Sequence, residues 1–506
     1  MPKTPPPKTQ LPKTQIPKPL LPPAPLKVWI VSGALTLAVV AIVGSIVVRF
    51  IPDLNPSPEP IDIDASLEEQ VSVIEPESDW LSEIACPAQQ RSSFESLKQE
   101  GIEARARANY SQARAKLKAA FDLCAAPEVL IALNNARIGN AAAHTLVVSV
   151  PFSGSNPNNA VEMLRGFAQA QNEINQQNGI DGVPLKLLVV DDGDREDVAS
   201  DLAIALTEDP AYANVLGIVG HWTSDVSIQA APIYASRKAL TFITPISTTN
   251  ELTNYSPWVF RATLNNRDGT RALARYMLNY WRKEKVAIFY VDDVTYSEEI
   301  RREFKRVVDP AQGGQIIAEF DMGAQDFNAR RAVRQAKESG AEVILLVPDN
   351  GSLNEAIAVI KANNKALKVL GDLANLYNSK VLSEAGEAAA GMVMAIPWDI
   401  DGNASANFVQ TSKQLWKGPV NHVTATSYSA LQAMAVAIEE RPTRAGVQRA
   451  LNDPNFAVLR NAANVPLRFE NGNRQARIQL VEVVQVPGNP GQPARLDFVP
   501  ILSVSE

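Results

Sequence analysis

The chain has 506 residues, enough for roughly two to four domains, and its hydrophobic (46%) and charged (20%) fractions are ordinary for a globular protein. A formal net charge of -7 argues against nucleic-acid binding, which needs a concentrated basic surface. The two cysteines and three histidines are few and widely spaced, which argues against a structural zinc site.

The N-terminal region has the pattern of a membrane anchor. Residues 28–48 carry no charge and, at ~1.5 Å per residue, match the ~30 Å core of a bilayer. Lysines without acids precede them, so the positive-inside rule places the N-terminus in the cytoplasm and everything past Phe50 outside. We expect a Pro/Lys-rich cytoplasmic tail at 1–27, a transmembrane anchor at 28–50 and an acidic, Pro-rich linker at 51–79.

The alternative to an anchor is a cleaved signal peptide. Such a peptide has a shorter apolar region, roughly 7–15 residues, which ends in a small-residue cleavage site. The residues after Val48 are Arg-Phe-Ile-Pro, a poor cleavage site. The sequence therefore favours an uncleaved anchor.

Residues 80–144 are expected to be helical, with amphipathic stretches at 92–108, 111–124 and 128–138. The stretch resembles a tetratricopeptide repeat at Tyr110, Ala113, Ala120 and Pro127. Only about one and a half repeats fit, and a plain helical hairpin spacer is an equal alternative. Because a lone repeat cannot bury its own face, we expect this TPR-like segment to pack on another part of the chain.

The two cysteines lie at matching ends of a predicted helical hairpin. Cys86 precedes the first helix and Cys124 ends the second, so the two would lie side by side. A disulfide fits that geometry and an oxidising compartment. It would stabilise the fold by roughly 3–4 kcal/mol, because it restricts the unfolded chain. Two free buried thiols are the alternative.

From Thr145 onward, apolar runs of strand length alternate with amphipathic helices, and the alternation restarts after Arg261. The first series of predicted strands covers 146–150, 185–192, 215–220 and 240–245, and the second covers 286–293, 314–322, 341–348, 366–372 and 391–397. Uninterrupted apolar strands between helices are typical of parallel sheets buried on both faces. The predicted fold class is therefore α/β, with two doubly wound lobes over residues 145–506.

Two hydroxyl-rich turns follow strands of the first lobe: GHWTSD at 220–225 and TPISTTNEL at 244–252. Ligands of such sheets bind beyond the carboxyl ends of the strands. A serine nucleophile needs a base, and no nucleophile elbow or phosphate-binding glycine motif occurs here. Hydroxyls beside a helix N-terminus can instead bind an anion. The turns thus predict capture rather than catalysis; the alternative is that Ser224 and Thr248 are only helix caps.

Residues 145–485 resemble the type I periplasmic solute-binding proteins of ABC transporters, in particular the branched-chain amino-acid (Leu/Ile/Val) branch. The resemblance rests on ordered motifs: INQQNGIDGVPLKLLVVDDGD, GHWTSD, TPISTTNEL, FYVDDVTYSEEI, TSYSALQAMAVAI and PLRFENGNRQ. It implies two lobes joined by a hinge of three chain crossings, near residues 261–264, 395–398 and 465–469, with the ligand between the lobes. It also implies that no cofactor is needed.

The resemblance assigns ligand-binding roles to particular residues. Ser224 and Thr248, with Ser247 in the same turn, would hold a carboxylate, and Ile246 would offer its carbonyl to an ammonium group. Tyr296 would close over the ligand. The further candidates are Asp372, one position before the family's ammonium-binding acid, where Leu373 stands; Asp349, near a family aromatic; and Trp222, expected to be exposed at the cleft mouth, with a packing role as its alternative.

These features predict a membrane-anchored extracytoplasmic solute-binding protein that captures an amino acid or similar small carboxylate. An ABC permease is the expected partner, and we expect no catalysis, cofactor, metal or nucleic acid. The alternatives are a tethered ligand sensor, an enzyme, and a ligand-free envelope scaffold. Some cell-envelope activators of peptidoglycan synthases likewise join helical repeats to this pair of lobes.

Overall fold

The computed structural model describes residues 86–154, 157–236, 238–308, 313–372, 375–398, 407–418, 420–463, 465–475, 478–487 and 494–501. The predicted tail, anchor and linker at 1–79 lie outside these ranges. Within them, no helix combines the length and the apolar character that crossing a membrane requires.

The helical segment matches the three predicted helices closely. It contains the short 3-10 helix η1 (Ala88–Gln90), then α4 (Arg91–Ala106), α5 (Tyr110–Leu123) and α6 (Pro127–Ile138). α4 and α5 pack closely as a hairpin, and a Cβ atom at Gly101 would lie only 2.6 Å from the Leu117 side chain. Cys86 and Cys124 form a disulfide at the end of the hairpin, with their Cα atoms 4.8 Å apart.

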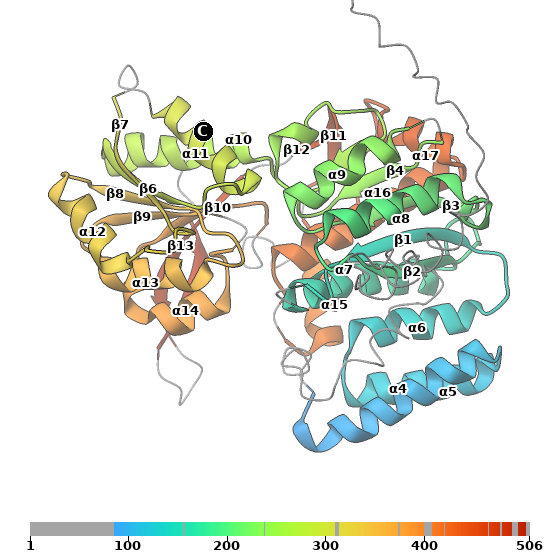
Figure 1. The fold of residues 1–506 in the computed structure, drawn as a ribbon. Helices are drawn as coiled ribbons and strands as arrows, with labels where there is room; N and C mark the ends of the chain where they lie inside the picture. Colours follow the sequence, from blue (N-terminus) through green and yellow to red (C-terminus); the bar gives the residue numbers. More distant parts are fainter. Residues whose placement is uncertain are drawn as a thin grey trace, which may run out of the picture. The chain divides into compact units, whose positions relative to one another are not determined.

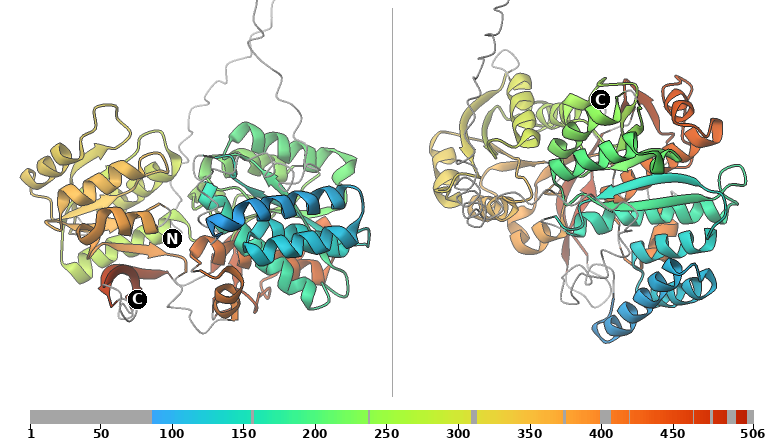
Figure 2. Two further views of the ribbon diagram at one scale, coloured as in Figure 1. Left: turned by 90° about the horizontal axis from the view of Figure 1, so that it is seen from below. Right: turned by 45° about the vertical axis from the view of Figure 1, so that its right-hand side comes forward.

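α6 packs between the α4–α5 hairpin and the first lobe, and so joins the helical segment to that lobe (Figures 1 and 2). Every residue from Pro127 to Ala136 is buried. The side-chain amide of Asn135 donates a 2.8 Å hydrogen bond to the Leu187 carbonyl of β2 and accepts one of 2.9 Å from the side chain of Gln171 on α7. The prediction that this segment packs on another part of the chain is therefore confirmed.

Lobe one is built on a seven-stranded sheet in the order β11-β12-β5-β4-β3-β1-β2. Its strands are β1 (His144–Val150), β2 (Leu185–Asp191), β3 (Val215–Gly220), β4 (Thr241–Thr244), β5 (Val259–Arg261), β11 (Arg468–Glu470) and β12 (Asn473–Gln475). Its helices are α7 (Pro157–Gln176), α8 (Glu196–Glu208), η2 (Pro210–Tyr212), α9 (Ser224–Tyr234), η3 (Asn250–Leu252), α15 (Asn407–Trp416), α16 (His422–Glu440) and α17 (Arg444–Leu451).

Lobe two also has a seven-stranded sheet, in the order β14-β13-β10-β9-β8-β6-β7. Its strands are β6 (Lys285–Tyr290), β7 (Gln315–Asp321), β8 (Val343–Leu346), β9 (Lys368–Gly371), β10 (Val393–Ile396), β13 (Gln479–Val486) and β14 (Arg495–Pro500). Its helices are α10 (Asn266–Arg275), the π-helical turn η4 (Tyr276–Trp281), α11 (Thr295–Val307), α12 (Ala329–Glu338), α13 (Leu353–Asn363), α14 (Ser379–Ala385) and η6 (Gly386–Ala389).

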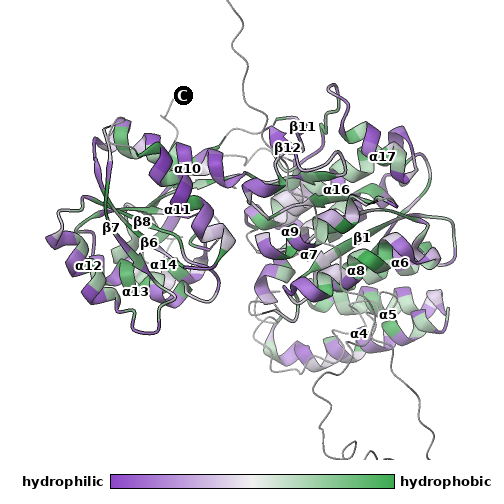
Figure 3. Ribbon diagram, turned by 45° about the horizontal axis from the view of Figure 1, so that its top comes forward, coloured by the Kyte–Doolittle hydropathy of each residue, from purple (hydrophilic) through white to green (hydrophobic). Residues whose placement is uncertain are grey.

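Both sheets are covered by helices on both faces, as the apolar runs predict. In lobe one, Val148 points into a core formed with α7, α16 and α17, while its neighbour Val147 points into a core formed with α8 and α9. In lobe two, Ala287 likewise packs in a core formed with α12–α14, and its neighbour Ile288 packs in a core formed with α10 and α11. Figure 3 shows hydrophobic strands beneath helices whose outer faces are hydrophilic.

The third predicted crossing is wrong. β11 and β12 form a hairpin that joins the sheet of lobe one, where Asn473 pairs with Arg261, and β13 is the first late strand in the other sheet. The chain therefore crosses after Gln475 rather than at 465–469. The Asn471-Gly472 turn, with both residues at positive φ, is a typical hairpin signal that the prediction did not use.

Candidate ligand-binding site

The first hydroxyl turn leads directly from β3 into α9. β3 ends at Gly220, where a Cβ atom would lie 2.6 Å from the Ser149 carbonyl oxygen, so the turn requires glycine. α9 begins at Ser224. The first amides of an α-helix have no partner within the helix, and they favour an anion. Ser224 thus stands where a ligand anion would find both a hydroxyl and backbone donors.

His221 does not serve as a base for Ser224. Its ring is fully buried, with Nδ1 2.8 Å from Asp192 Oδ2 and Nε2 3.2 Å from the Tyr234 hydroxyl. Burial opposes ionisation of Asp192, but hydrogen bonds from His221 and Ser149 keep its pKa below the ordinary value. Both ring nitrogens of His221 are therefore engaged by Asp192 and Tyr234 rather than by the serine.

The second turn meets the first. The Thr244 hydroxyl oxygen accepts a 2.9 Å hydrogen bond from the Ser247 amide, which folds the chain back after β4. Ser247 Oγ then lies 3.5 Å from Ser224 Oγ. Within the described residues, the hydroxyl of Thr248 has no hydrogen-bond partner, although only 2% of this residue is exposed. The two turns therefore place hydroxyl donors together, and one is left available to a ligand.

A buried cation lies against the second turn. The Arg261 guanidinium donates to the Thr248 carbonyl at 3.1 Å and is completely buried. Burial lowers the pKa of Arg261 to about 10, so the group remains charged at neutral pH. Its positive charge thus lies on the second turn, which also contacts the buried carboxylate of Glu299.

In lobe two, the structure brings Tyr296 and Asp372 together. The Tyr296 hydroxyl donates a 2.6 Å hydrogen bond to Asp372 Oδ2, and the amides of Asn375 and Leu376 donate to the same carboxyl group. Burial raises the pKa of Asp372 to about 6, against these hydrogen bonds. Asp372 thus orients Tyr296, and most of the hydrogen-bonding capacity of its carboxylate is already used by Tyr296, Asn375 and Leu376.

Asp349 lies in a tight turn before α13. Its carboxylate accepts a 2.8 Å hydrogen bond from the Ser352 amide, and its own amide donates to Ser352 Oγ at 3.0 Å. These bonds hold the turn closed. A contact of Asp349 with the ligand stays a prediction.

A sequence profile of the periplasmic binding protein family matches residues 145–489. The chain belongs to this family. A Leu/Ile/Val-binding protein homologue from Brucella abortus is 26% identical over 308 residues, which are 59% of this chain and 79% of the relative.

Solved structures show the same periplasmic binding protein fold. An ABC transporter substrate-binding protein from Desulfitobacterium hafniense in complex with leucine has a TM-score of 0.57 at 22% identity, covering 70% of this chain and 99% of its own. A solute-binding protein of an ABC transporter from Rhodopseudomonas palustris, in complex with 3,4-dihydroxybenzoic acid, has a TM-score of 0.60 at 16% identity, covering 71% and 96%. At these identities the likeness establishes the fold alone.

The expectation that Trp222 is exposed is wrong. Only 7% of Trp222 is exposed, and it belongs, with Ile246, to the hydrophobic core of lobe one. In this lobe of a periplasmic binding protein, the indole of Trp222 is part of the packed core. The packing alternative therefore describes this residue better.

Sequence reasoning missed polar residues that organise the site: Arg261, Asn266 and Glu299. Each is at most 5% exposed and hydrogen-bonds to the turn at 248–250. The presence of Arg261 within the apolar strand Val259–Arg261 was a usable signal, since buried arginines need partners.

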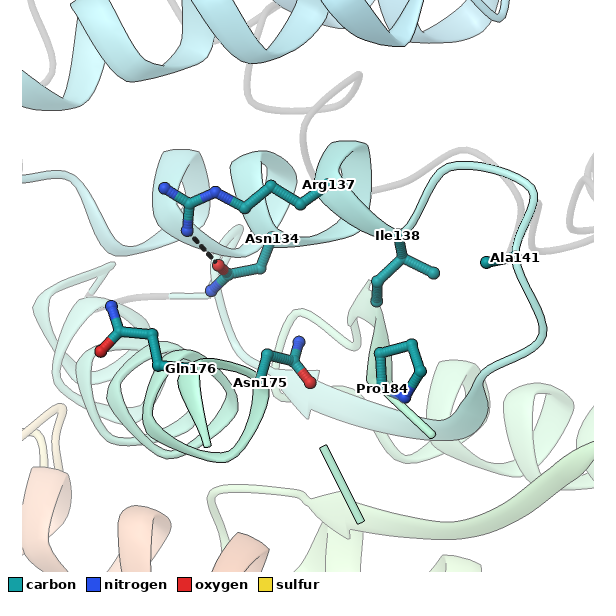
Figure 4. Close-up of a pocket in the computed structure, with 7 residues that line it drawn as sticks. All are labelled: Asn134, Arg137, Ile138, Ala141, Asn175, Gln176 and Pro184. Atoms are coloured by element: carbon teal, nitrogen blue, oxygen red, sulfur yellow. Dashed lines mark hydrogen bonds between the residues drawn. The ribbon is translucent and has the colours of Figure 1, made fainter. Parts of the chain in front are cut away.

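A cavity of about 460 Å³ lies elsewhere, where α6 meets α7 (Figure 4). It is lined by Asn134, Arg137, Ile138, Ala141, Asn175, Gln176 and Pro184. Arg137 donates a 2.8 Å hydrogen bond to the Asn134 amide oxygen, and burial lowers its pKa. None of the predicted site residues lines this cavity, so the hydroxyl turns remain the candidate site.

Proposed function

We propose that the two-lobe domain binds a small carboxylate, such as an amino acid, outside the cytoplasm and delivers it to an ABC transporter. The single observation that carries this proposal is the meeting of the two hydroxyl turns at 3.5 Å between Ser224 Oγ and Ser247 Oγ. Both turns lie at the carboxyl ends of neighbouring strands, beside the N-terminus of α9 and a buried arginine. Such a set of donors suits both oxygens of a carboxylate.

The names of relatives guide the choice of ligands to test. Relatives in this family are named for leucine, isoleucine and valine, and one structural neighbour holds 3,4-dihydroxybenzoic acid. These compounds share a carboxylate and an apolar body, but only the amino acids carry an ammonium group. Tyr296 and Ile246 would contact the remainder of the ligand, with Asp349 and Asp372 nearby as polar groups.

We also propose that residues 28–50 hold the protein in the membrane as an uncleaved anchor, with the N-terminus cytoplasmic. The absence of charge over 28–48 and the lysines before it support this topology. A binding protein so attached would keep its ligand site close to a permease.

A tethered sensor is the second candidate. The observation that favours it is the burial of α6 between the α4–α5 hairpin and lobe one, because any change in lobe one would reach the helical segment directly. A transport protein and a sensor would bind the carboxylate through the same hydroxyl turns. A deletion strain separates them: loss of solute uptake supports transport, and loss of a transcriptional or signalling response with normal uptake supports a sensor.

A thermal-shift panel on the full chain in detergent tests the binding function. The panel contains the twenty amino acids, benzoate and 3,4-dihydroxybenzoate. A ligand at 100 times its Kd stabilises by about 2.7 kcal/mol, which raises Tm by several degrees. A shift from one class of carboxylate supports the proposal, and no shift from any member contradicts it.

A further inference from the structure

The carboxylate of Glu299, on α11, is buried among hydrogen-bond donors from two other segments. Glu299 is 5% exposed. It accepts hydrogen bonds from the Thr249 hydroxyl at 2.7 Å, the Asn250 amide at 2.9 Å and the Asn266 side chain at 2.7 Å. Within the described residues it has no ion pair. A buried carboxylate satisfied by neutral donors alone holds those donors tightly, because losing any of them leaves charge unsolvated.

These donors follow or contact Thr248, the residue predicted to hold the ligand carboxylate. Thr249 and Asn250 follow it in the chain. The Asn266 amide donates to the Thr248 carbonyl at 2.7 Å, while its side chain donates to Glu299. One asparagine therefore links the backbone of Thr248 to the carboxylate of Glu299.

The other end of the link is Tyr296. Glu299 lies three residues, about one helical turn, after Tyr296 on α11, so the two side chains share a face of the helix. Tyr296 is itself held by Asp372 of lobe two. The helix thus carries both the aromatic ring proposed to cover the ligand and the carboxylate that fixes the turn of lobe one.

The turn also lies next to an opposite charge. Arg261 donates to the Thr248 carbonyl from within lobe one, and the negative charge of Glu299 partly offsets the lowering of the Arg261 pKa by burial. Two buried charges of opposite sign therefore act on one short turn. Because burying the two charges costs much of what their attraction contributes, the arrangement mainly fixes the geometry of the turn and adds little to the stability of the fold.

We propose that Glu299 is a positioning residue that sets the hydroxyl of Thr248 relative to the ring of Tyr296. Its role is to hold the lobe-one turn against the lobe-two helix, so that both ligand contacts are placed before a ligand arrives. Preorganisation of this kind lowers the cost of binding. The functional consequence rests on the proposed function; the link itself rests on the contacts of Glu299.

The first test needs no ligand. Spin labels are placed on the exposed side chains of lobe one and lobe two by Asp201→Cys and Lys337→Cys in the full chain, with the native disulfide left oxidised. Distances between the labels are measured by pulsed electron resonance. Glu299→Ala is expected to shift or broaden the distance distribution. An unchanged distribution would overturn the proposal.

Glu303→Ala is the matched control on the same helix. Glu303 is 9% exposed and pairs with Arg271 and Arg306 instead of the turn. Its loss should leave the distance distribution unchanged. If Glu299→Ala fails to fold, Glu299→Gln, which keeps the side-chain volume, replaces it and is expected to change the distribution in the same direction; no change with Gln would then refute the proposal.

The second test uses L-leucine as the probe in isothermal titration. Glu299→Ala should weaken binding by about tenfold in the parent chain, but by less than about twofold when Thr248 is already valine. A full tenfold loss in both backgrounds would show that Glu299 does not act through Thr248. If the parent chain does not bind L-leucine, the proposal of leucine as a ligand fails, while the distance measurement still decides the role of Glu299.

Discussion

Replacing Thr248 with valine removes its hydroxyl and keeps the branched shape of the side chain. The backbone of Thr248 is held independently by Arg261 and Asn266, at 3.1 and 2.7 Å from its carbonyl oxygen. The substitution therefore removes a donor without releasing the turn. We expect the folded structure to be retained, with a Tm within a few degrees of the parent chain.

The loss in affinity follows from the hydrogen bond that disappears. A neutral donor bonded to a charged oxygen contributes roughly 1.5–3 kcal/mol, which corresponds to a ten- to hundredfold weaker Kd. The upper part of this range is the better estimate, because Thr248 is only 2% exposed and water replaces the lost donor poorly. Isothermal titration with the best carboxylate from the thermal-shift panel measures the change.

Thr241→Val is the matched control for this experiment. Thr241 lies on β4, is fully buried, and has a hydroxyl without a partner among the described residues. Replacing that hydroxyl with a methyl group should leave affinity unchanged and leave stability equal or higher. If Thr248→Val binds as tightly as the parent chain, the turn at 246–248 does not hold the carboxylate and the reasoning fails.

Other predictions concern charge, covalent structure and topology. Because burial raises the pKa of Asp372 from 3.8 to about 6, the folded state binds a proton at this carboxyl group more tightly than the unfolded state, and Asp372 should contribute a loss of stability on the order of 2–3 kcal/mol as pH rises from about 4 to about 6. In urea unfolding across this range, the free energy of unfolding of the parent chain should fall relative to that of Asp372→Asn, and identical slopes would contradict the assignment. Mass spectrometry without reductant should find Cys86 linked to Cys124, and reduction should lower the stability of the helical segment by roughly 3–4 kcal/mol; recovery of both thiols alkylated would argue against the bond. Protease added to intact spheroplasts should degrade the chain past Phe50 and spare residues 1–27, whereas a protected C-terminal domain would reverse the topology.

The sequence was informative wherever the structure depends on local pattern. Strands buried on both faces must be apolar throughout, so the runs ending at Gly220 and Thr244 were recognisable as parallel strands. Carboxyl ends of parallel neighbours meet at one edge, which is why the proximity of Ser224 and Ser247 could be predicted. The helical segment was equally readable from its amphipathic spacing.

The sequence was uninformative where contacts join distant segments. Glu299 lies in an ordinary amphipathic helix, and its donors are 33 to 50 residues earlier, so nothing in its neighbourhood distinguishes it from Glu298. Trp222 was misread because burial of a side chain beyond a strand end depends on the packing of the whole lobe. The β11–β12 hairpin was assigned to the wrong lobe because its partner, β5, is about 210 residues away.

The disulfide gives the molecule a defined path for mechanical load. Tension on the chain from the N-terminal side enters at Cys86 and passes through the disulfide to Cys124, three residues before α6 begins at Pro127. The hairpin of α4 and α5 lies inside the closed loop and carries none of this force. A pull therefore reaches α6, which packs on lobe one, directly, and under oxidising conditions the loop adds no length to the chain that precedes α6. After reduction, the loop between Cys86 and Cys124 would also bear the force. If it unfolded, it would add up to roughly 120 Å of chain length before the force reached lobe one.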